Sequence, residues 1–266
     1  MPTGGLARRA TAIKSLLTRE EGIPLIFDAG SSLMGEWVSL ASQGRVIVEA
    51  MNQMGYDAMV IGRMDLLKGI GVAQARAKEA AFAVLSANLV SKRDEKPLFD
   101  PYAVIIKKGV RIGVIGLSDE TALRMPGVAE EAKLLDPQET ARRYVSELSG
   151  RVDVLIVLSR LGLEEDRALA YAVPGIHVIV GGKTRQLMNE PERMGNTIIV
   201  QQGYDGEWLG YLKVTFDAQG VPLSARAMPI PLTEDFPDDP RVAAIVERYK
   251  AQYPTPTPWP TPTPRH

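Results

Sequence analysis

The chain has 266 residues, of which 45% are hydrophobic and 24% charged, and its formal net charge is −1. It is long enough to bury a sizeable core, and its balanced charge provides no bulk field that would attract nucleic acid or an anionic membrane. The absence of cysteine excludes disulfides, thiolate metal sites and cysteine nucleophiles.

Short apolar runs alternate with amphipathic segments along the chain, which predicts an α/β architecture. We expect helices over Leu6–Arg19, Val46–Met54, Val72–Ala80, Pro137–Leu148, Glu164–Ala172 and Pro240–Ala251. We expect strands over Pro24–Phe27, Ala58–Ile61, Ala83–Ser86, Ala103–Ile106, Arg111–Ile115, Val154–Leu158, Val178–Val180, Thr197–Val200 and Gly210–Phe216. Because residues 197–231 read mostly as strand and turn, the sheets should be mixed rather than purely parallel.

Two further segments bear on domain organisation and location. Proline alternates with other residues over 254–264, which favours extended polyproline II and predicts a Pro/Thr-rich tail or linker at 254–266 after one domain over 1–253. Residues 1–9 lack the apolar stretch of a signal peptide, and no apolar run is long enough to span a bilayer.

Several motifs, in a fixed order, resemble the amino-terminal domain of the 5′-nucleotidase family of metallophosphoesterases. They are Gly4–Arg8, Phe27–Gly30, Met51–Ala58, Leu85–Asn88, Ile112–Leu117, Leu158–Ser159, Leu161–Leu163, Val173–Ile176, Val180–Gly182, Val200–Gln201 and Leu209–Gly210. The resemblance covers about residues 4–217. It implies a four-layer sandwich of two mixed β-sheets flanked by helices, with the family's first central strand missing from this chain.

The same resemblance implies a site for two divalent metals such as Zn, Mn or Mg, held by Asp, Asn and His side chains. At the matching positions this chain carries other residues. Ser31 stands where the family has an Asp, Arg63 and Met64 where it has Asn-His, and Arg160, Lys183 and Arg185 where it has His. The family's Asp-x-His motif would precede Gly4 and is not in the chain. We therefore expect no metal, no cofactor and no two-metal catalysis.

The four cations Arg63, Arg160, Lys183 and Arg185 should converge where the metals would lie. Two unit charges about 6 Å apart repel by roughly 3 kcal/mol at an effective dielectric constant of about 20. The sequence leaves two interpretations open. The cations either replace the metals structurally, by pairing with carboxylates such as Asp28 or Asp65, or form a pocket with Ser31 for phosphate, sulfate or a small phosphorylated ligand.

Three further patterns have plainer interpretations. The glycines of 109–116 predict a hairpin turn and a strand, because no helix follows as a dinucleotide site would require. Glu164, Glu165 and Asp166 favour a helix amino-terminal turn, and His177 in an apolar run favours a structural role.

The functional prediction is a catalytically degenerate, non-catalytic module that is structural or binds an anion. The alternative is a phosphoesterase with residual activity. The family resemblance favours an extracytoplasmic location, either periplasmic or secreted, and the tail could join a further domain or a surface.

Overall fold

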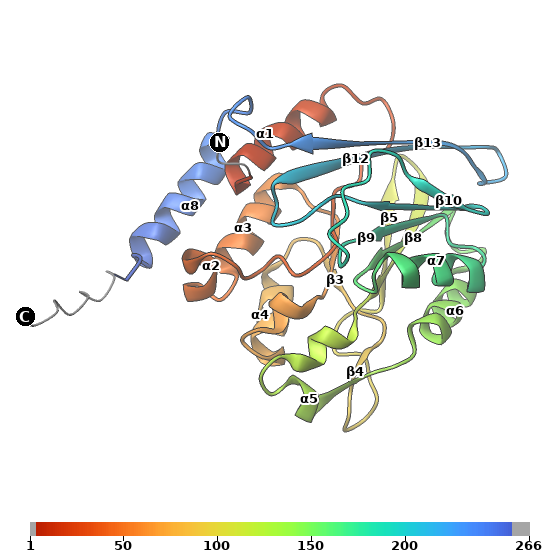
Figure 1. The fold of residues 1–266 in the computed structure, drawn as a ribbon, viewed down its shortest axis with the longest axis horizontal. Helices are drawn as coiled ribbons and strands as arrows, with labels where there is room; N and C mark the ends of the chain where they lie inside the picture. Colours follow the sequence, from red (N-terminus) through yellow and green to blue (C-terminus); the bar gives the residue numbers. More distant parts are fainter. Residues whose placement is uncertain (1–3, 257–266) are drawn as a thin grey trace, which may run out of the picture.

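Two β-sheets pack face to face at the centre of the molecule, and helices cover their outer faces (Figure 1). The computed structural model describes residues 4–256. Its helices are α1 Leu6–Leu17, α2 Trp37–Ala41, α3 Arg45–Met54, α4 Ile70–Glu79, α5 Val128–Glu131, α6 Pro137–Leu148, α7 Leu163–Ala172 and α8 Pro240–Gln252, with 3₁₀ turns η1 Arg63–Leu66 and η2 Glu120–Arg124. Its strands are β1 Phe27–Asp28, β2 Ala58–Val60, β3 Ala83–Leu85, β4 Leu89–Ser91, β5 Tyr102–Lys107, β6 Val110–Leu117, β7 Ala132–Leu134, β8 Val154–Ser159, β9 Val178–Gly181, β10 Glu192–Met194, β11 Thr197–Gln201, β12 Trp208–Phe216 and β13 Pro222–Pro231.

The smaller of the two sheets is parallel and the larger is mixed. The smaller has the order β1-β2-β3, and the larger has the order β10-β11-β9-β8-β6-β5. Within the larger sheet β6, β8, β9 and β11 run parallel, while β5 and β10 pair antiparallel at its two edges. The pairs β12–β13 and β4–β7 form separate antiparallel ribbons.

Three apolar layers hold this arrangement together. Between the sheets, Val60 and Leu85 of the smaller sheet share a core with Val114, Leu158 and Val178 of the larger one. A second cluster joins α1, α3 and α4 to the smaller sheet, and a third joins α6 and α7 to the larger sheet. This layering confirms the predicted α/β sandwich with helices on both outer faces.

The first predicted strand is shorter than expected. The pattern over Pro24–Phe27 reads as a strand, but the ladder holds only Phe27 and Asp28. The N–H of Ile26 donates to the Asp57 carboxylate (2.8 Å) rather than to a neighbouring strand. The short strands β4, β7 and β10, and helices α2 and α5, were not predicted, because segments of three to five residues carry too little periodicity.

The carboxyl end of the described chain is fixed to the domain. Helix α8 begins after the cap Asp239, whose side chain accepts from the N–H groups of Arg241 and Val242, and it packs against α1 and α3. At its other end, the indole N–H of Trp37 donates to the carbonyls of Tyr253 (3.2 Å) and Pro254 (3.1 Å). The predicted tail lies, beyond residue 256, outside the described residues.

Candidate functional site

Polar and charged side chains gather where the parallel strands of both sheets end. Asp28 closes β1, and Gly62 with η1 follows β2, both in the smaller sheet. In the larger sheet, Asp119 follows β6, Arg160 follows β8 and Lys183 follows β9. Because the sheets pack with these ends on the same side, loops far apart in sequence meet there, as is usual for ligand sites of α/β folds.

A buried carboxylate organises the smaller sheet's side of this site. Asp65 is fully buried, and its Oδ2 accepts from the N–H groups of Ser31 and Gly62 (2.8 Å each). Its Oδ1 accepts from those of Ser32 and Leu33 (2.9 Å each). Burial raises the pKa of Asp65 to about 6, although these N–H bonds oppose the rise. The side chain therefore fixes the loop after β1 against the turn after β2.

Arg160 extends from the larger sheet towards these loops. Its Nη1 donates to the carbonyls of Ala29 and Gly30 (3.3 Å each), while its Nε is buried without a hydrogen-bond partner among residues 4–256. Burial lowers the pKa of Arg160, against the opposing attraction of Asp65, Asp119 and Asp28. The guanidinium is thus a half-buried positive charge that three nearby carboxylates attract at longer range.

Two glycines leave the space that this guanidinium occupies. A Cβ at Gly182 would lie 2.8 Å from Nη1 of Arg160 and 2.7 Å from Cβ of Ala29. A Cβ at Gly62 would lie 3.1 Å from Nε of Arg160 and 2.6 Å from Oγ of Ser31. Ser31 and Arg160 are therefore brought together across the boundary of the two sheets, as the sequence predicted.

The other three cations do not share this position. Lys183 Nζ pairs with Asp119 (3.0 Å) and Glu120 (3.4 Å). Burial disfavours the charged amine, but these two carboxylates outweigh it and raise the pKa of Lys183. Arg185 is exposed, with its guanidinium 5.6 Å from the ring centroid of Tyr204, and Arg63 is exposed at the start of η1.

The predicted ion pairs with Asp28 or Asp65 are not seen: among residues 4–256 Arg160 has no ion-pair partner within 4.0 Å, and these carboxylates attract it only at longer range. The direct partners of Lys183 are Asp119 and Glu120, which the sequence did not indicate. The sequence feature that could have indicated Asp119 and Glu120 is the polar run directly after the apolar strand that ends at Leu117. Ser31 is also less available than predicted, because its Oγ accepts from the N–H of Met64 (3.2 Å).

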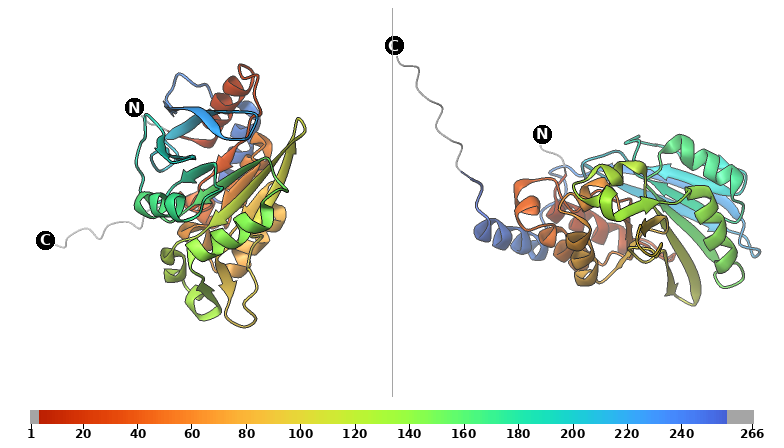
Figure 2. Two further views of the ribbon diagram at one scale, coloured as in Figure 1. Left: turned by 90° about the vertical axis from the view of Figure 1, so that its right-hand side faces the viewer. Right: turned by 90° about the horizontal axis from the view of Figure 1, so that it is seen from below.

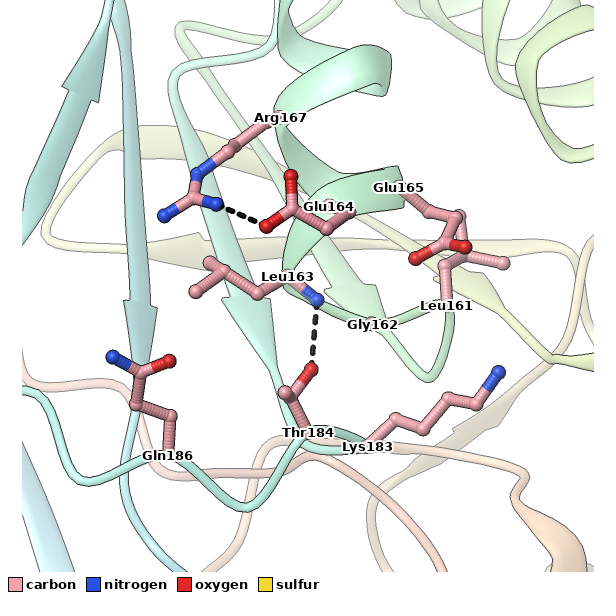
Figure 3. Close-up of a pocket in the computed structure, with 9 residues that line it drawn as sticks. All are labelled: Leu161, Gly162, Leu163, Glu164, Glu165, Arg167, Lys183, Thr184 and Gln186. Carbon is pink, nitrogen blue, oxygen red and sulfur yellow. Dashed lines mark hydrogen bonds and ion pairs between the residues drawn. The ribbon is translucent and has the colours of Figure 1, made fainter.

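A cleft of about 450 Å³ opens beside Lys183 (Figure 3). Lys183 and Thr184 line one side, and the first turn of α7 lines the other with Glu164 and Glu165. Thr184 Oγ1 accepts from the N–H of Leu163 (2.8 Å). This bond caps the amino-terminal end of α7, where the sequence predicted the first turn of a helix. The cleft contains both signs of charge.

Another buried carboxylate supports the loop that carries Arg160. Asp166 is fully buried, and accepts hydrogen bonds from Ser159 Oγ and from Gln201 Nε2 (3.4 Å). Burial raises the pKa of Asp166 to about 6, against these two bonds. The folded chain therefore takes up this proton more readily than the unfolded chain, so this group's stabilising contribution grows as pH falls from 7 towards 4.

We expect Asp166→Asn to reduce this pH dependence. The gain in the free energy of unfolding between pH 8 and pH 5 should shrink by roughly 1–2 kcal/mol, because the variant has no proton to bind there. Urea denaturation at the two pH values measures it, with the exposed Asp205→Asn as control. An unchanged difference between the two pH values would show that Asp166 does not titrate in this window.

The residues present do not fit a two-metal centre. Both carboxylate oxygens of Asp65 accept hydrogen bonds from backbone N–H groups. Of the Asp119 oxygens, one forms the ion pair with Lys183 and the other accepts from Thr121 Oγ1 (2.8 Å). Within residues 4–256, no three side chains of His, Cys, Asp or Glu are grouped so that they could hold an ion. His177 is also engaged, since its Nδ1 accepts from the N–H of Leu155 (2.9 Å).

The two facing sheets with polar residues at their strand ends define the class of fold. The calcineurin-like phosphoesterase YfkN of Bacillus subtilis superposes with a TM-score of 0.81 at 19% identity, covering 95% of this chain and 90% of that one. This chain therefore has a metallophosphoesterase fold.

Sequence similarity narrows the class to a family. The chain is 30% identical over 276 residues to the snake venom 5′-nucleotidase of Naja atra, covering 94% of this chain and 51% of that protein. The 5′-nucleotidase precursor of Thermus thermophilus matches with a TM-score of 0.86 at 30% identity, covering 94% of this chain and 54% of that one. No family model matches the chain. The chain is a 5′-nucleotidase-like metallophosphoesterase domain, and it spans about half the length of these relatives.

These relatives correct one prediction. We expected no cofactor, but 5′-nucleotidases are a family that uses divalent metals, so the prediction is contradicted at the level of the family.

A separate finding concerns membranes: among the described residues, no helix is both long and apolar enough to cross a bilayer.

Proposed function

We propose that this domain is a catalytically degenerate relative of the 5′-nucleotidases that binds an anion such as phosphate or sulfate. The observation that carries the proposal is the Arg160 guanidinium at the meeting point of the strand ends, with a buried Nε that lacks a hydrogen-bond partner in residues 4–256. An anion oxygen or a water could accept from this N–H. By the family resemblance, Arg160 stands where a relative carries a metal-binding His.

The arrangement of the four cations divides the proposed site into two parts. Arg160 is held by carbonyls and Lys183 by carboxylates, which favours a structural role for these two cations. Arg63 and Arg185 are exposed, and Arg185 lies near enough to Arg160 to lower its pKa. We propose that the exposed pair attracts the anion and that Arg160 and Ser31 form the inner wall.

We expect millimolar phosphate or sulfate to raise the melting temperature, because an anion that binds only the folded chain stabilises it by mass action. Arg160→Ala combined with Arg185→Ala should abolish the shift measured against that variant's own anion-free baseline. Differential scanning fluorimetry at constant ionic strength measures it, with chloride as the control salt. The exposed Arg241→Ala, at the start of α8, should keep the full shift.

Either of two results would contradict the anion site. One is the absence of a shift with either anion, which would leave the purely structural role of the cations. The other is an equal shift in the double variant, which would place the anion elsewhere.

The alternative function is a phosphoesterase with residual activity, and its support is the family itself. It predicts turnover of a generic phosphate ester when Mn, Zn or Mg is supplied, and near two metal ions per chain on elemental analysis. Turnover with bound metal would replace the degenerate interpretation, whereas no turnover with any of the three metals would remove the alternative.

Domain limits and location are proposed on similar grounds. We place one domain at residues 1–253 and a Pro/Thr-rich tail or linker at 254–266, supported by the fixed end of α8 and the proline pattern.

An extracytoplasmic location is consistent with relatives such as the venom enzyme. Protease protection of the native protein in intact cells tests the location.

A further inference from the structure

A second cleft, of about 330 Å³, lies at the opposite end of the larger sheet from Arg160. It opens between the carboxyl end of α7, the amino-terminal ends of β9 and β11, and the turns that connect β10 to β11 and β12 to β13. This end of the molecule is at the right in Figure 1 and faces the viewer in the left view of Figure 2. The volume is at the lower end of the range for small-molecule sites.

Fixed turns form two walls of this cleft. Arg193 donates from Nε to the carbonyl of Gly195 (3.1 Å) and from Nη2 to that of Pro222 (2.7 Å), so it ties the two turns together. Within the β12–β13 turn, Oδ1 of Asp217 accepts from the N–H of Gln219 (2.9 Å). Ligand sites are usually formed before the ligand arrives, and this cleft meets that condition.

The lining of the cleft carries no charge at neutral pH. The residues of the described chain that line it include no Asp, Glu, Lys or Arg. Burial lowers the pKa of His177, and its Nδ1 accepts from the N–H of Leu155 (2.9 Å), so the imidazole is neutral. A charged ligand would find no opposite charge here, whereas the cleft beside Lys183 contains both signs. The second cleft therefore suits an uncharged ligand.

Polar groups at this cleft are left without partners by the folded chain. Since Nδ1 of His177 is an acceptor, its proton is on Nε2, and within residues 4–256 this N–H makes no hydrogen bond. The side-chain amides of Asn196 and Gln219 make none in the same range, and each offers a donor and an acceptor. A hydroxyl group also donates and accepts, so these amides suit a ligand with several hydroxyl groups.

Tyr171 adds an aromatic surface to the cleft. It is 87% exposed, more than any other large hydrophobic residue of the described chain. An aromatic ring of this kind offers a broad apolar face together with a polar tip. A sugar ring has a face of C–H groups and a rim of hydroxyl groups, so it matches an aromatic face that lies beside neutral amides.

We propose that this cleft binds a neutral sugar, whose C–H face lies against the ring of Tyr171. Its hydroxyl groups accept from the Nε2–H of His177 and exchange hydrogen bonds with the amides of Asn196 and Gln219. The size of the cleft limits the ligand to a monosaccharide or to the end of a longer sugar chain. This inference does not depend on the proposed anion site, which lies at the other end of the strands.

Nuclear magnetic resonance of the ¹⁵N-labelled chain tests the proposal. The probes are methyl α-glucoside, methyl α-mannoside, methyl β-galactoside and N-acetylglucosamine, each titrated at millimolar concentration. We expect at least one of them to shift the backbone amide signals of Tyr171, His177 and Asn196 and to leave those around Arg160 unchanged.

Two truncations at exposed positions test the assigned contacts. Tyr171→Ala removes the aromatic face and Gln219→Ala removes an amide, and each should raise the Kd for that sugar about tenfold. Tyr204→Ala, at a 49% exposed tyrosine in the loop between β11 and β12, is the matched control and should bind as the wild type does.

Three results would overturn the proposal. The first is the absence of shifts at the cleft with every one of the sugars. The second is an unchanged Kd in both Tyr171→Ala and Gln219→Ala. The third is a response at the cleft to adenine and to none of the sugars, which would assign it to a flat heterocycle instead.

Discussion

Asp65→Asn is expected to lower the free energy of unfolding at pH 8 by about 3 kcal/mol, one of the two largest effects predicted for this chain. The wild-type carboxylate accepts four backbone N–H groups, two at each oxygen. An asparagine keeps one oxygen and turns an NH₂ group towards the other two donors. Those two N–H groups then lie buried without an acceptor.

Chemical denaturation at pH 8 measures this loss, since Asp65, with a pKa of about 6, is ionised there. The control is Asp205→Asn, which makes the same substitution at an exposed site and should change the stability little. Equal stability of Asp65→Asn and the wild type would mean that the four N–H groups find other acceptors. The loops after β1 and β2 would then not depend on this carboxylate.

Arg160→Met is expected to destabilise the domain by roughly 1–3 kcal/mol at pH 8, because removing this half-buried cation leaves the buried carboxylates near it uncompensated. Asp28, Asp65 and Asp119 all interact favourably with the guanidinium. The loss should be smaller at pH 5, where Asp65, left without the cation, binds a proton and no longer repels its neighbours.

Two companion variants separate charge from shape in this prediction. Arg160→Lys keeps the positive charge and should recover part of the lost stability, while Arg241→Met removes an exposed arginine and should have little effect. A loss that is the same at pH 5 and pH 8 would show that Arg160 acts by packing alone.

Strand–helix alternation was enough to predict an α/β architecture, because long, apolar strands such as β6 and β8 leave a clear pattern, whereas the two facing sheets were implied only by the family resemblance. The ribbon of β4 and β7 could not be predicted, since it joins three residues near 90 to three near 133 through tertiary contacts. The length of β1 could not be predicted either, because the N–H of Ile26 donates to the carboxylate of Asp57, which is distant in sequence.

The location of the candidate site could also be predicted, because motifs at strand ends meet at one edge of the sheets. The directions of the side chains could not. Arg160 turns inward through space left by Gly62 and Gly182, whereas Arg185 turns out onto Tyr204. Both are arginines after a strand end, and only the packed loops distinguish them.

The contact between Trp37 and the end of α8 has a mechanical consequence. The indole N–H donates hydrogen bonds to the carbonyls of Tyr253 and Pro254, at the point where the chain leaves the domain. A pull applied to the Pro/Thr-rich segment therefore loads these two bonds and the docked helix before it reaches either sheet.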